Sequence, residues 1–406
     1  MNIAVTGIGV VSSIGLTFDS WWRSVKEKRR NIKKEKRYGI SDETEFQTAV
    51  IDESEIRNKI TGVNTNHYDK VQLLATAAGE EAWKCADVKS MDYSSDEMGV
   101  VLGSTYGYID SVSRFYIDVL ENGPMAVSPM NFTNTVMNAA AGKLSIQYKL
   151  SGICSTIATG QCSGLDAIAY SCDTISQKQC KVLMTGASSS LFDALVFGFQ
   201  ASGKLAKENE AGSYIFAPFD KNANGTVLGE GASIFVLEDY ESAKKRGATI
   251  KAIIKSVKSG FVTSSNGKNK QIEMFSDIID QVVEEAGIKK ESIQLISSGA
   301  SSNIVKDTIE ASAIQKSFEN ENIDVKISAV KSTVGECLDA GSAFQFALGV
   351  GAIQNDCIPP ITGLNKPKIE TLNYVTENEP EEVMNVLITT LSDAGQCTAA
   401  ILSREV

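Results

Sequence analysis

One arrangement of secondary structure occurs twice along this chain of 406 residues. The strand-like run Met98–Gly103 ends in a turn, and the run Ile293–Gly299 has the same form in the second half. Each half also contains a strand, a turn of small residues and an apolar helix, and each closes with an apolar strand, at Ile234–Leu237 and Ala399–Leu402. Strands that alternate with helices predict an α/β protein with mostly parallel sheets buried between helical layers.

The duplicated pattern predicts an N-terminal half at residues 1–250 and a C-terminal half at residues 251–406. No low-complexity linker marks the boundary between Arg246 and Lys251. The chain is 43% hydrophobic and long enough to build one large core or two. We therefore expect the two halves to share a single core and not to separate as independent domains.

Net charge and cysteine usage indicate which partners the protein is not expected to bind and in which cellular compartment it is expected. A net charge of −11 argues against binding to nucleic acid or to an anionic membrane surface. Eight scattered cysteines without a CxxC pair indicate a reduced, cytoplasmic protein. The apolar N-terminus is broken by Gly7, Gly9 and Gly15, which is typical of a first strand and turn and not of a signal peptide or a membrane span. We expect no cofactor and no bound metal.

The segment most relevant to chemistry is the run Ser155-Thr-Ile-Ala-Thr-Gly-Gln-Cys-Ser-Gly164. A β-branched strand leads into a turn of small residues, and an apolar helical pattern follows from Leu165. Such a strand-turn-helix presents one side chain at a helix N-terminus. There the partial positive charge of the helix end favours a thiolate, and backbone N–H groups can hold an oxyanion.

This segment resembles the mount of the nucleophilic cysteine in the β-ketoacyl synthases, and the resemblance extends from end to end of the chain. Its other parts are the opening Ile3–Ser12, the run Pro218-Phe-Asp-Lys221, the loop Gly225–Gly231 and the strand-like Ala232–Glu238. Together these motifs are highly specific, whereas each alone is weak. The resemblance implies a thiolase-like fold of five layers, α-β-α-β-α, built from the two duplicated halves.

By this resemblance, Gln161 holds the position of the nucleophile. The family's elbow is similar to Thr-Ala-Cys-Ser-Ser-Gly, and counting forward from Thr159 or back from Gly164 leads to the same position. A carboxamide is not a usable nucleophile, so no acyl-enzyme can form through it. Cys162 comes one residue later, and a rotation of about 100° per helical residue points it away from the pocket. A buried, inert thiol is the expectation for Cys162, and a reactive thiol is the alternative.

The same resemblance implies that both catalytic histidines of the family are missing. The chain has one histidine, His67. The first catalytic position falls on Gly299, and the second run reads Lys331-Ser-Thr-Val-Gly-Glu336, with the lysine retained and glutamate in place of histidine. Neutral imidazole donates an N–H to a developing oxyanion, whereas an ionised glutamate only accepts. The loop that gates acyl access in the active enzymes is matched by Asp393–Thr398, which lacks its phenylalanine and its glycine pair.

These departures resemble the chain length factor, which is the β-type ketosynthase subunit of bacterial type II polyketide synthases. The match includes the order Gln161-Cys-Ser-Gly-Leu-Asp-Ala167. The resemblance implies a catalytically inactive subunit that pairs with a cysteine-bearing ketosynthase α subunit and shapes the tunnel for the growing polyketide. Acyl carrier protein would dock mainly through that partner. Three alternatives stay open: a malonyl-carrier decarboxylase of the glutamine-bearing type, a self-sufficient ketosynthase that uses Cys162, and a homodimeric scaffold without a polyketide role.

A basic run from Arg23 to Arg37 stands out in this acidic chain, because nine lysine and arginine residues there outnumber two glutamates. The run is either a solvated helix end and loop or a docking surface for an acidic carrier protein. The sequence does not separate these two interpretations.

An apolar stripe between Gly103 and Pro124 is the candidate for the tunnel. Its apolar positions 109, 112, 115, 116, 119 and 120 lie on one face of a predicted helix. In the chain length factors, residues on such a helix line the far end of the polyketide tunnel at the dimer interface. The matching positions here are Ile109, Val112 and Tyr116. The alternative is that the stripe is ordinary core.

The run Met130–Gly142 is the candidate for the subunit interface. By the same resemblance it is the helix that crosses to the partner subunit, with Thr133, Asn134, Val136 and Met137 as the candidate contacts. Its alanine and glycine residues permit close backbone approach. A helix buried within one chain has the same composition, so this alternative also stays open.

Overall fold

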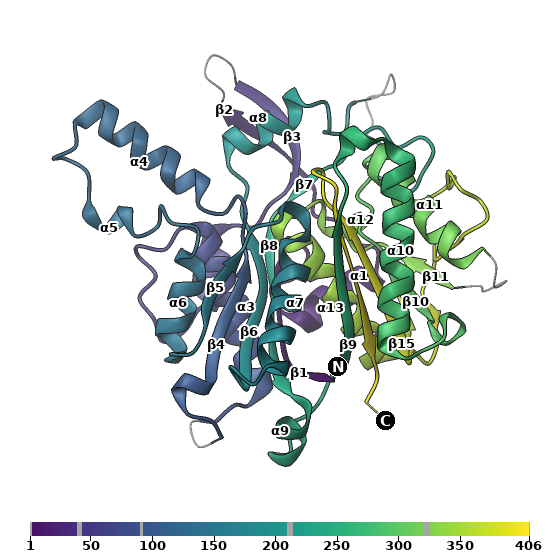
Figure 1. The fold of residues 1–406 in the computed structure, drawn as a ribbon. Helices are drawn as coiled ribbons and strands as arrows, with labels where there is room; N and C mark the ends of the chain where they lie inside the picture. The colour runs from purple at the N-terminus through teal and green to yellow at the C-terminus, as the bar shows by residue number, and fades with distance from the viewer. Residues whose placement is uncertain (1, 39–42, 90–91, 209–213, 320–324, 406) are drawn as a thin grey trace.

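Helices and strands alternate through both halves of the chain, as the repeated pattern predicts (Figure 1). The computed structural model describes residues 2–38, 43–89, 92–208, 214–319 and 325–405. Its α-helices are α1 (Phe18–Lys26), α2 (Glu53–Lys59), α3 (Lys70–Ala86), α4 (Ile109–Asn122), α5 (Pro129–Phe132), α6 (Ala139–Tyr148), α7 (Ser163–Ser176), α8 (Asp193–Ala201), α9 (Tyr240–Lys245), α10 (Lys268–Ala286), α11 (Ile304–Phe318), α12 (Lys331–Val334) and α13 (Gly341–Asn355).

The strands are β1 (Ile3–Ser12), β2 (Lys33–Tyr38), β3 (Glu43–Ala49), β4 (Met98–Gly103), β5 (Cys154–Ile157), β6 (Val182–Ser189), β7 (Leu228–Gly229), β8 (Gly231–Asp239), β9 (Ala252–Phe261), β10 (Leu295–Ser297), β11 (Lys326–Ser328), β12 (Cys357–Ile358), β13 (Asn373–Tyr374), β14 (Glu379–Pro380), β15 (Asn385–Leu391) and β16 (Gln396–Ser403). Short 3-10 turns are η1 (Ser95–Glu97), η2 (Gly160–Cys162), η3 (Ser264–Asn266), η4 (Lys290–Ser292) and η5 (Leu338–Ala340).

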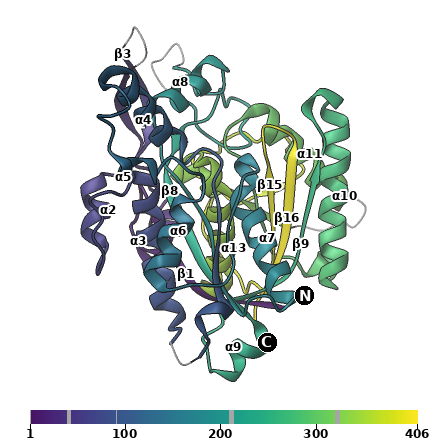
Figure 2. The same ribbon diagram turned by 60° about the vertical axis from the view of Figure 1, so that its left-hand side comes forward.

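The main strands form one eleven-stranded sheet in the order β13-β11-β10-β15-β16-β9-β1-β8-β6-β4-β5. Its two half-sheets face each other across a middle layer made of α7 and α13 (Figure 2). Helices α3 and α6 cover the outer face of the first half-sheet, and α10 and α11 cover that of the second. The predicted five-layer, thiolase-like architecture is therefore confirmed.

The prediction of mostly parallel pairing is wrong. Of the ten pairings within the large sheet, five are antiparallel, and these follow one another along its centre from β15 to β6. Strands β15 and β16 are joined by residues 392–395 alone, which is too short for the crossover that a parallel pair requires. The pairing of β1 with β9 over Ile3–Val5 connects the two half-sheets.

Two glycines in β1 allow α3 to approach the first half-sheet closely. A Cβ atom on Gly9 would lie 2.0 Å from the carbonyl oxygen of Ala78, and one on Gly7 would lie 2.2 Å from that of Ala82. Only a residue without a Cβ permits this approach. Ile8, between the two glycines, packs into the core between the half-sheets. The alternation Gly-Ile-Gly is therefore a packing requirement of this layer.

The middle helix α13 is mostly apolar and is buried around its whole circumference. Residues 341–353 are all buried. The ring of Phe344 packs against Trp21, and that of Phe346 packs against Phe235. A mostly apolar helix without an exposed face is expected in a protein interior, and here the surrounding layers hold it in place. None of the described helices combines the length and the apolar character needed to cross a bilayer.

Helices α4 and α5 project from the layered body (Figure 1). The prediction of one continuous helix over Met130–Gly142 is wrong, because α5 ends at Phe132 and α6 begins at Ala139. The hydroxyl groups of Thr133 and Thr135 donate to the carbonyl oxygens three residues earlier, each at 2.8 Å. Such side-chain bonds to the backbone compete with continuation of a helix.

Candidate functional site

The turn between β5 and α7 places Gln161 just before the N-terminus of α7. Gly160 adopts φ of +65° at this turn, a conformation that favours glycine. Its N–H donates to Thr105 Oγ1 at 2.9 Å, and the N–H of Thr159 donates to Ser163 Oγ at 3.0 Å. The turn is therefore held by hydrogen bonds on both sides, and Gln161 is 1% exposed.

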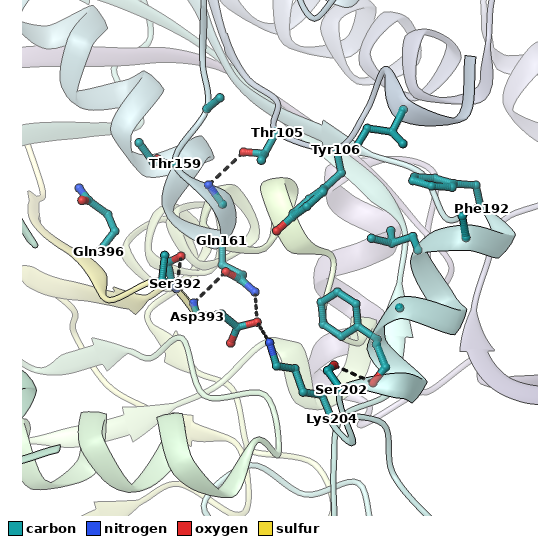
Figure 3. A pocket seen from close by; sticks show the side chains of 18 of the residues that line it. Thr105, Tyr106, Thr159, Gln161, Phe192, Ser202, Lys204, Ser392, Asp393 and Gln396 are labelled. Atoms are coloured by element: carbon teal, nitrogen blue, oxygen red, sulfur yellow. Dashed lines mark hydrogen bonds and ion pairs between the residues drawn. The ribbon is translucent and has the colours of Figure 1, made fainter. Parts of the chain in front are cut away.

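The carboxamide of Gln161 forms a reciprocal pair with Asp393, which lies in the loop between β15 and β16. Gln161 Nε2 donates to Asp393 Oδ2 at 3.0 Å, and the backbone N–H of Asp393 donates to Gln161 Oε1 at 3.1 Å. Figure 3 shows both bonds. The donor end and the acceptor end of the carboxamide are therefore both in use, and its orientation is fixed.

Two lysines also converge on the Asp393 carboxylate. Lys204 Nζ lies 2.7 Å from Oδ2, and Lys306 Nζ lies 3.3 Å from Oδ1. Burial alone would raise the pKa of Asp393, but the two ammonium groups and the Gln161 hydrogen bond hold it well below its usual range. Burial lowers the pKa of Lys306, yet the Asp393 and Glu336 carboxylates outweigh this and the net shift is upward. The carboxylate is therefore ionised at neutral pH.

A cavity of about 840 Å³ opens beside Gln161 (Figure 3). Phe192, Leu195 and Phe199 on and around α8 form an apolar wall, and Asp393 and Lys204 contribute the charged side chains of the lining. Among the described residues that line the cavity, none is a cysteine or a histidine. The cavity thus offers room for an apolar chain next to a carboxamide and a bridged carboxylate.

Cys162 does not line this cavity. It is fully buried, and its Sγ donates to the carbonyl oxygen of Gln396 at 3.4 Å. Burial, and to a smaller extent the Asp166 carboxylate, raises the pKa of Cys162 well above its usual range. A thiol with a raised pKa is a poor source of the thiolate nucleophile.

Gly299 lies in the loop after β10, and its N–H donates to Glu310 Oε1 at 2.9 Å. A Cβ atom at this position would lie 3.1 Å from the carbonyl oxygen of Thr389 and 3.3 Å from Gln345 Nε2. These are closer than ordinary side-chain contacts, so neighbouring groups occupy the space that a side chain on residue 299 would need. Gly299 is not among the residues that line the cavity.

Lys331 and Glu336 form a buried ion pair. Lys331 Nζ lies 3.0 Å from Glu336 Oε2, and the two side chains are 0% and 2% exposed. The other carboxylate oxygen of Glu336 accepts the backbone N–H of Leu338 at 3.0 Å. Neither residue lines the cavity. Within the described ranges, no group of three or more His, Cys, Asp or Glu side chains is placed to hold a metal ion.

The structure separates the three candidate tunnel residues. Ile109 lines the cavity beside Gln161, at the base of α4. Val112 is half-buried, and Tyr116 is 64% exposed on the projecting part of the helix. The helix predicted from the apolar stripe is present, as α4. Beyond the first turn, Phe115 packs its ring against Phe132 of α5, whereas Tyr116 and Leu120 are exposed, so packing within the chain accounts for only part of the stripe.

The four candidate interface residues also differ in how exposed they are. Thr133 is exposed, and Val136 and Met137 are 40% and 37% exposed. Asn134 is buried within its own chain, where Gln72 Nε2 donates to its Oδ1 at 3.0 Å and its Nδ2 donates to the carbonyl oxygen of His67 at 2.9 Å. Asn134 therefore anchors this segment to the body, and its amide is not free for a partner. His67, the single histidine, is exposed.

Exposed apolar side chains gather along the projecting segment. We call this set the apolar arm. Its members are Tyr116, Ile117, Leu120, Met125, Met130, Phe132, Val136 and Met137, all 37% exposed or more. A concentration of large exposed apolar residues on one segment is typical of a protein-protein contact surface.

Part of the basic run Arg23–Arg37 has a structural role. Arg30 donates to the carbonyl oxygens of Ser332, Phe216 and Thr362 at 2.6–2.7 Å, and burial lowers its pKa to about 10. Arg37 pairs with Glu35 at 2.8 Å. The guanidinium groups of these two arginines therefore already bind groups of their own chain. Arg23, Lys33 and Lys34, in contrast, are exposed.

The sequence did not identify Lys204 and Lys306 as site residues. Nothing in the sequence near Lys306 indicates that this side chain faces Asp393. The sequence presents Asp393 only as the first residue of the run Asp393–Thr398, with no sign of its partners. Its contact with Gln161 joins residues 232 positions apart, so local spacing does not reveal it.

Comparison with known proteins agrees with this fold. The model of the β-ketoacyl synthase N-terminal domain matches residues 1–243, and that of the C-terminal domain matches residues 236–365. The 3-oxoacyl-[acyl-carrier-protein] synthase 2 of Coxiella burnetii is 28% identical, over 90% of this chain and 89% of that protein. The tetracenomycin polyketide synthase ketoacyl synthase alpha subunit of Streptomyces glaucescens is 25% identical, over 99% and 97%.

Solved structures with the same fold include the ishigamide ketosynthase/chain length factor, with a TM-score of 0.86 at 22% identity, covering 100% of this chain and 99% of that chain. A type II polyketide synthase acyl-carrier protein in complex with its ketosynthase bound to the hexaketide gives a TM-score of 0.87 at 22% identity and the same coverage. Because the two domain models together span residues 1–365 and the five-layer architecture agrees with them, this chain belongs to the β-ketoacyl synthase family.

Proposed function

We propose that this chain is a non-condensing, ketosynthase-like subunit of a type II polyketide synthase. It pairs with a cysteine-bearing ketosynthase and shapes the tunnel in which the polyketide grows. The observation that carries the proposal is the state of Gln161, whose carboxamide occupies the nucleophile's position and is bonded at both ends to Asp393. A carboxamide forms no thioester with an acyl group, so the step that begins condensation has no acceptor here.

The surroundings of Gln161 support this proposal. No imidazole or thiol lines the cavity among the described residues, and general acid–base catalysis needs a group that titrates near the working pH. The nearest thiol in the sequence, Cys162, is buried and bonded to a backbone carbonyl. A self-sufficient ketosynthase that uses Cys162 would require this turn to rearrange.

The decarboxylase alternative also lacks the groups that it needs. A malonyl unit would bring its carboxylate beside Lys204, the cation among the described residues that line the cavity, and Lys204 is already paired with Asp393. One of the two N–H groups of the Gln161 carboxamide, which could otherwise stabilise an enolate oxygen, is donated to Asp393. The proposal therefore assigns neither decarboxylation nor condensation to this chain.

The apolar arm supports pairing with another subunit, because isolated proteins rarely expose such a surface. Relatives and structures similar to this chain are named as an alpha subunit and as a ketosynthase/chain length factor, which fits a paired role. In this proposal, the arm extends the cavity into the contact with the partner. Ile109 lies at the cavity end of α4 and Tyr116 at the partner end, and acyl carrier protein docks mainly on the partner.

Co-expression with the ketosynthase of the same pathway tests the pairing. We expect a 1:1 heterodimer in sedimentation experiments, and higher thermal stability than this chain has alone, because a partner that binds the folded state stabilises it. Leu120→Asp, on the 77% exposed Leu120 of the arm, should weaken the complex about tenfold or more. Glu377→Ala is the matched control, since the Glu377 side chain is 80% exposed and lies outside the arm. A stable monomer or homodimer that ignores the ketosynthase would contradict the proposal.

A further inference from the structure

Asp393 stands in the wall between two cavities. The cavity beside Gln161 has a volume of about 840 Å³, and a second cavity of about 400 Å³ lies on the other side. Four residues line both cavities, and they are Ser202, Lys204, Ser392 and Asp393. Gln161 lines the first cavity but not the second, and Lys306 lines the second cavity but not the first.

Three separate parts of the chain hold the Asp393 carboxylate. Gln161 precedes α7, Lys204 follows α8 and Lys306 lies in α11. Oδ2 accepts from Lys204 at 2.7 Å and from Gln161 Nε2 at 3.0 Å, and Oδ1 faces Lys306 Nζ at 3.3 Å. Both oxygens of one carboxylate are thus engaged by two ammonium groups and one amide donor, the arrangement with which proteins bind a carboxylate ligand.

Asp393 is the carboxylate that both ammonium groups contact. The side chains of Lys306 and Asp393 are 11% and 24% exposed, and that of Lys204 is 35% exposed. The Glu336 and Asp307 carboxylates also raise the pKa of Lys306, but the contact that joins the two lysines is the one with Asp393. The pair of lysines is therefore suited to an anion, and Asp393 fills the place of that anion from within the chain.

We infer that Lys204 and Lys306 form a carboxylate-binding subsite that Asp393 occupies as an internal ligand. The subsite would accept a small carboxylate, such as the free carboxylate of a malonyl unit, at the junction of the two cavities. Because Asp393 occupies it, carboxylate-bearing acyl units are excluded from the cavity beside Gln161. The inference deepens the proposed function and rests on it for its biological meaning, since it explains why this subunit does not compete with its partner for extender units.

Removal of the internal carboxylate tests the inference on the full-length chain. Asp393→Ala leaves the two ammonium groups without their counter-charge, and an anion from solution should replace it. We expect this variant to bind malonate, measured by titration calorimetry at constant ionic strength, about tenfold or more tightly than the uncharged malonamide. The unchanged protein and the Glu377→Ala control, which also loses one negative charge, should show no such preference.

Two results would overturn the inference. One is a folded Asp393→Ala variant, with an unchanged circular dichroism spectrum, that binds malonate no better than malonamide. The other is equally tight malonate binding by the unchanged protein. If the alanine variant does not fold, Asp393→Asn retains the side-chain volume and removes the charge. Malonate should then raise its melting temperature more than malonamide does, and equal shifts would contradict the inference. The assay uses no thioester and no partner, so its outcome is separate from the test of acyl transfer.

Discussion

Replacing Lys331 with methionine is expected to lower the free energy of unfolding by about 3–5 kcal/mol. The ammonium group of Lys331 and the carboxylate of Glu336 are buried together at 3.0 Å, with side chains 0% and 2% exposed. Lys331→Met leaves the Glu336 charge buried without its partner, and water does not reach it to compensate. Equilibrium urea unfolding of the single variant measures the loss.

The double variant Lys331→Met/Glu336→Gln separates the cost of an orphaned charge from a general packing defect. Glutamine has nearly the volume of glutamate and still accepts the N–H of Leu338, but it carries no charge. We expect the double variant to recover most of the lost stability, because removing both members of a buried pair costs much less than removing one. Equal destabilisation by the single and double variants would show that the pair does not act through charge. Glu377→Ala, in the exposed pair with Lys28, should change stability by about 0.5 kcal/mol or less.

Tyr116→Ala is expected to change which polyketide dominates in a reconstituted heterodimer. If Tyr116 and Val112 line the far part of the tunnel, removal of the tyrosine ring opens room for about one or two further extension units. Val112→Phe should have the opposite effect, because a bulky side chain in a packed tunnel is not accommodated without strain. Mass spectrometry of the products measures both effects.

The heterodimer itself should persist in both variants, which sedimentation verifies before the products are compared. Lower total yield with an unchanged ratio of products, in both variants, would mean that the stripe on α4 serves packing alone. In that case another segment sets chain length. Glu121→Ala is a suitable control, because Glu121 is exposed on the same helix but lies outside both the predicted stripe and the apolar arm.

The layered fold could be predicted because its signals are local and repeated. The run Met98–Gly103 is strand β4, and the helical pattern from Leu165 lies within α7. The orientation of the central strands was predicted wrongly, because local patterns do not show which way a strand runs. That orientation depends on the short connection between β15 and β16 and on the pairing of β1 with β9.

The candidate site was predictable only in part, for the same reason. The position of Gln161 follows from its immediate neighbours in the sequence, whereas its contacts with Asp393 depend on how distant segments pack. The pairing of Glu336 with Lys331 spans only five positions, yet their identities alone do not show whether they turn toward each other or toward the cavity. The break between α5 and α6 depends on threonine side chains that bond to the backbone, and apolar periodicity does not report it.

Intact-mass spectrometry tests the central claim most directly. The purified chain, alone and paired with its ketosynthase, is incubated with an acyl-carrier thioester and with malonyl carrier protein. We predict that the partner gains the mass of the acyl group while this chain retains its unmodified mass under both conditions. An acyl adduct on this chain, mapped by peptide sequencing to Cys162 or to any other residue beside the cavity, would contradict the account.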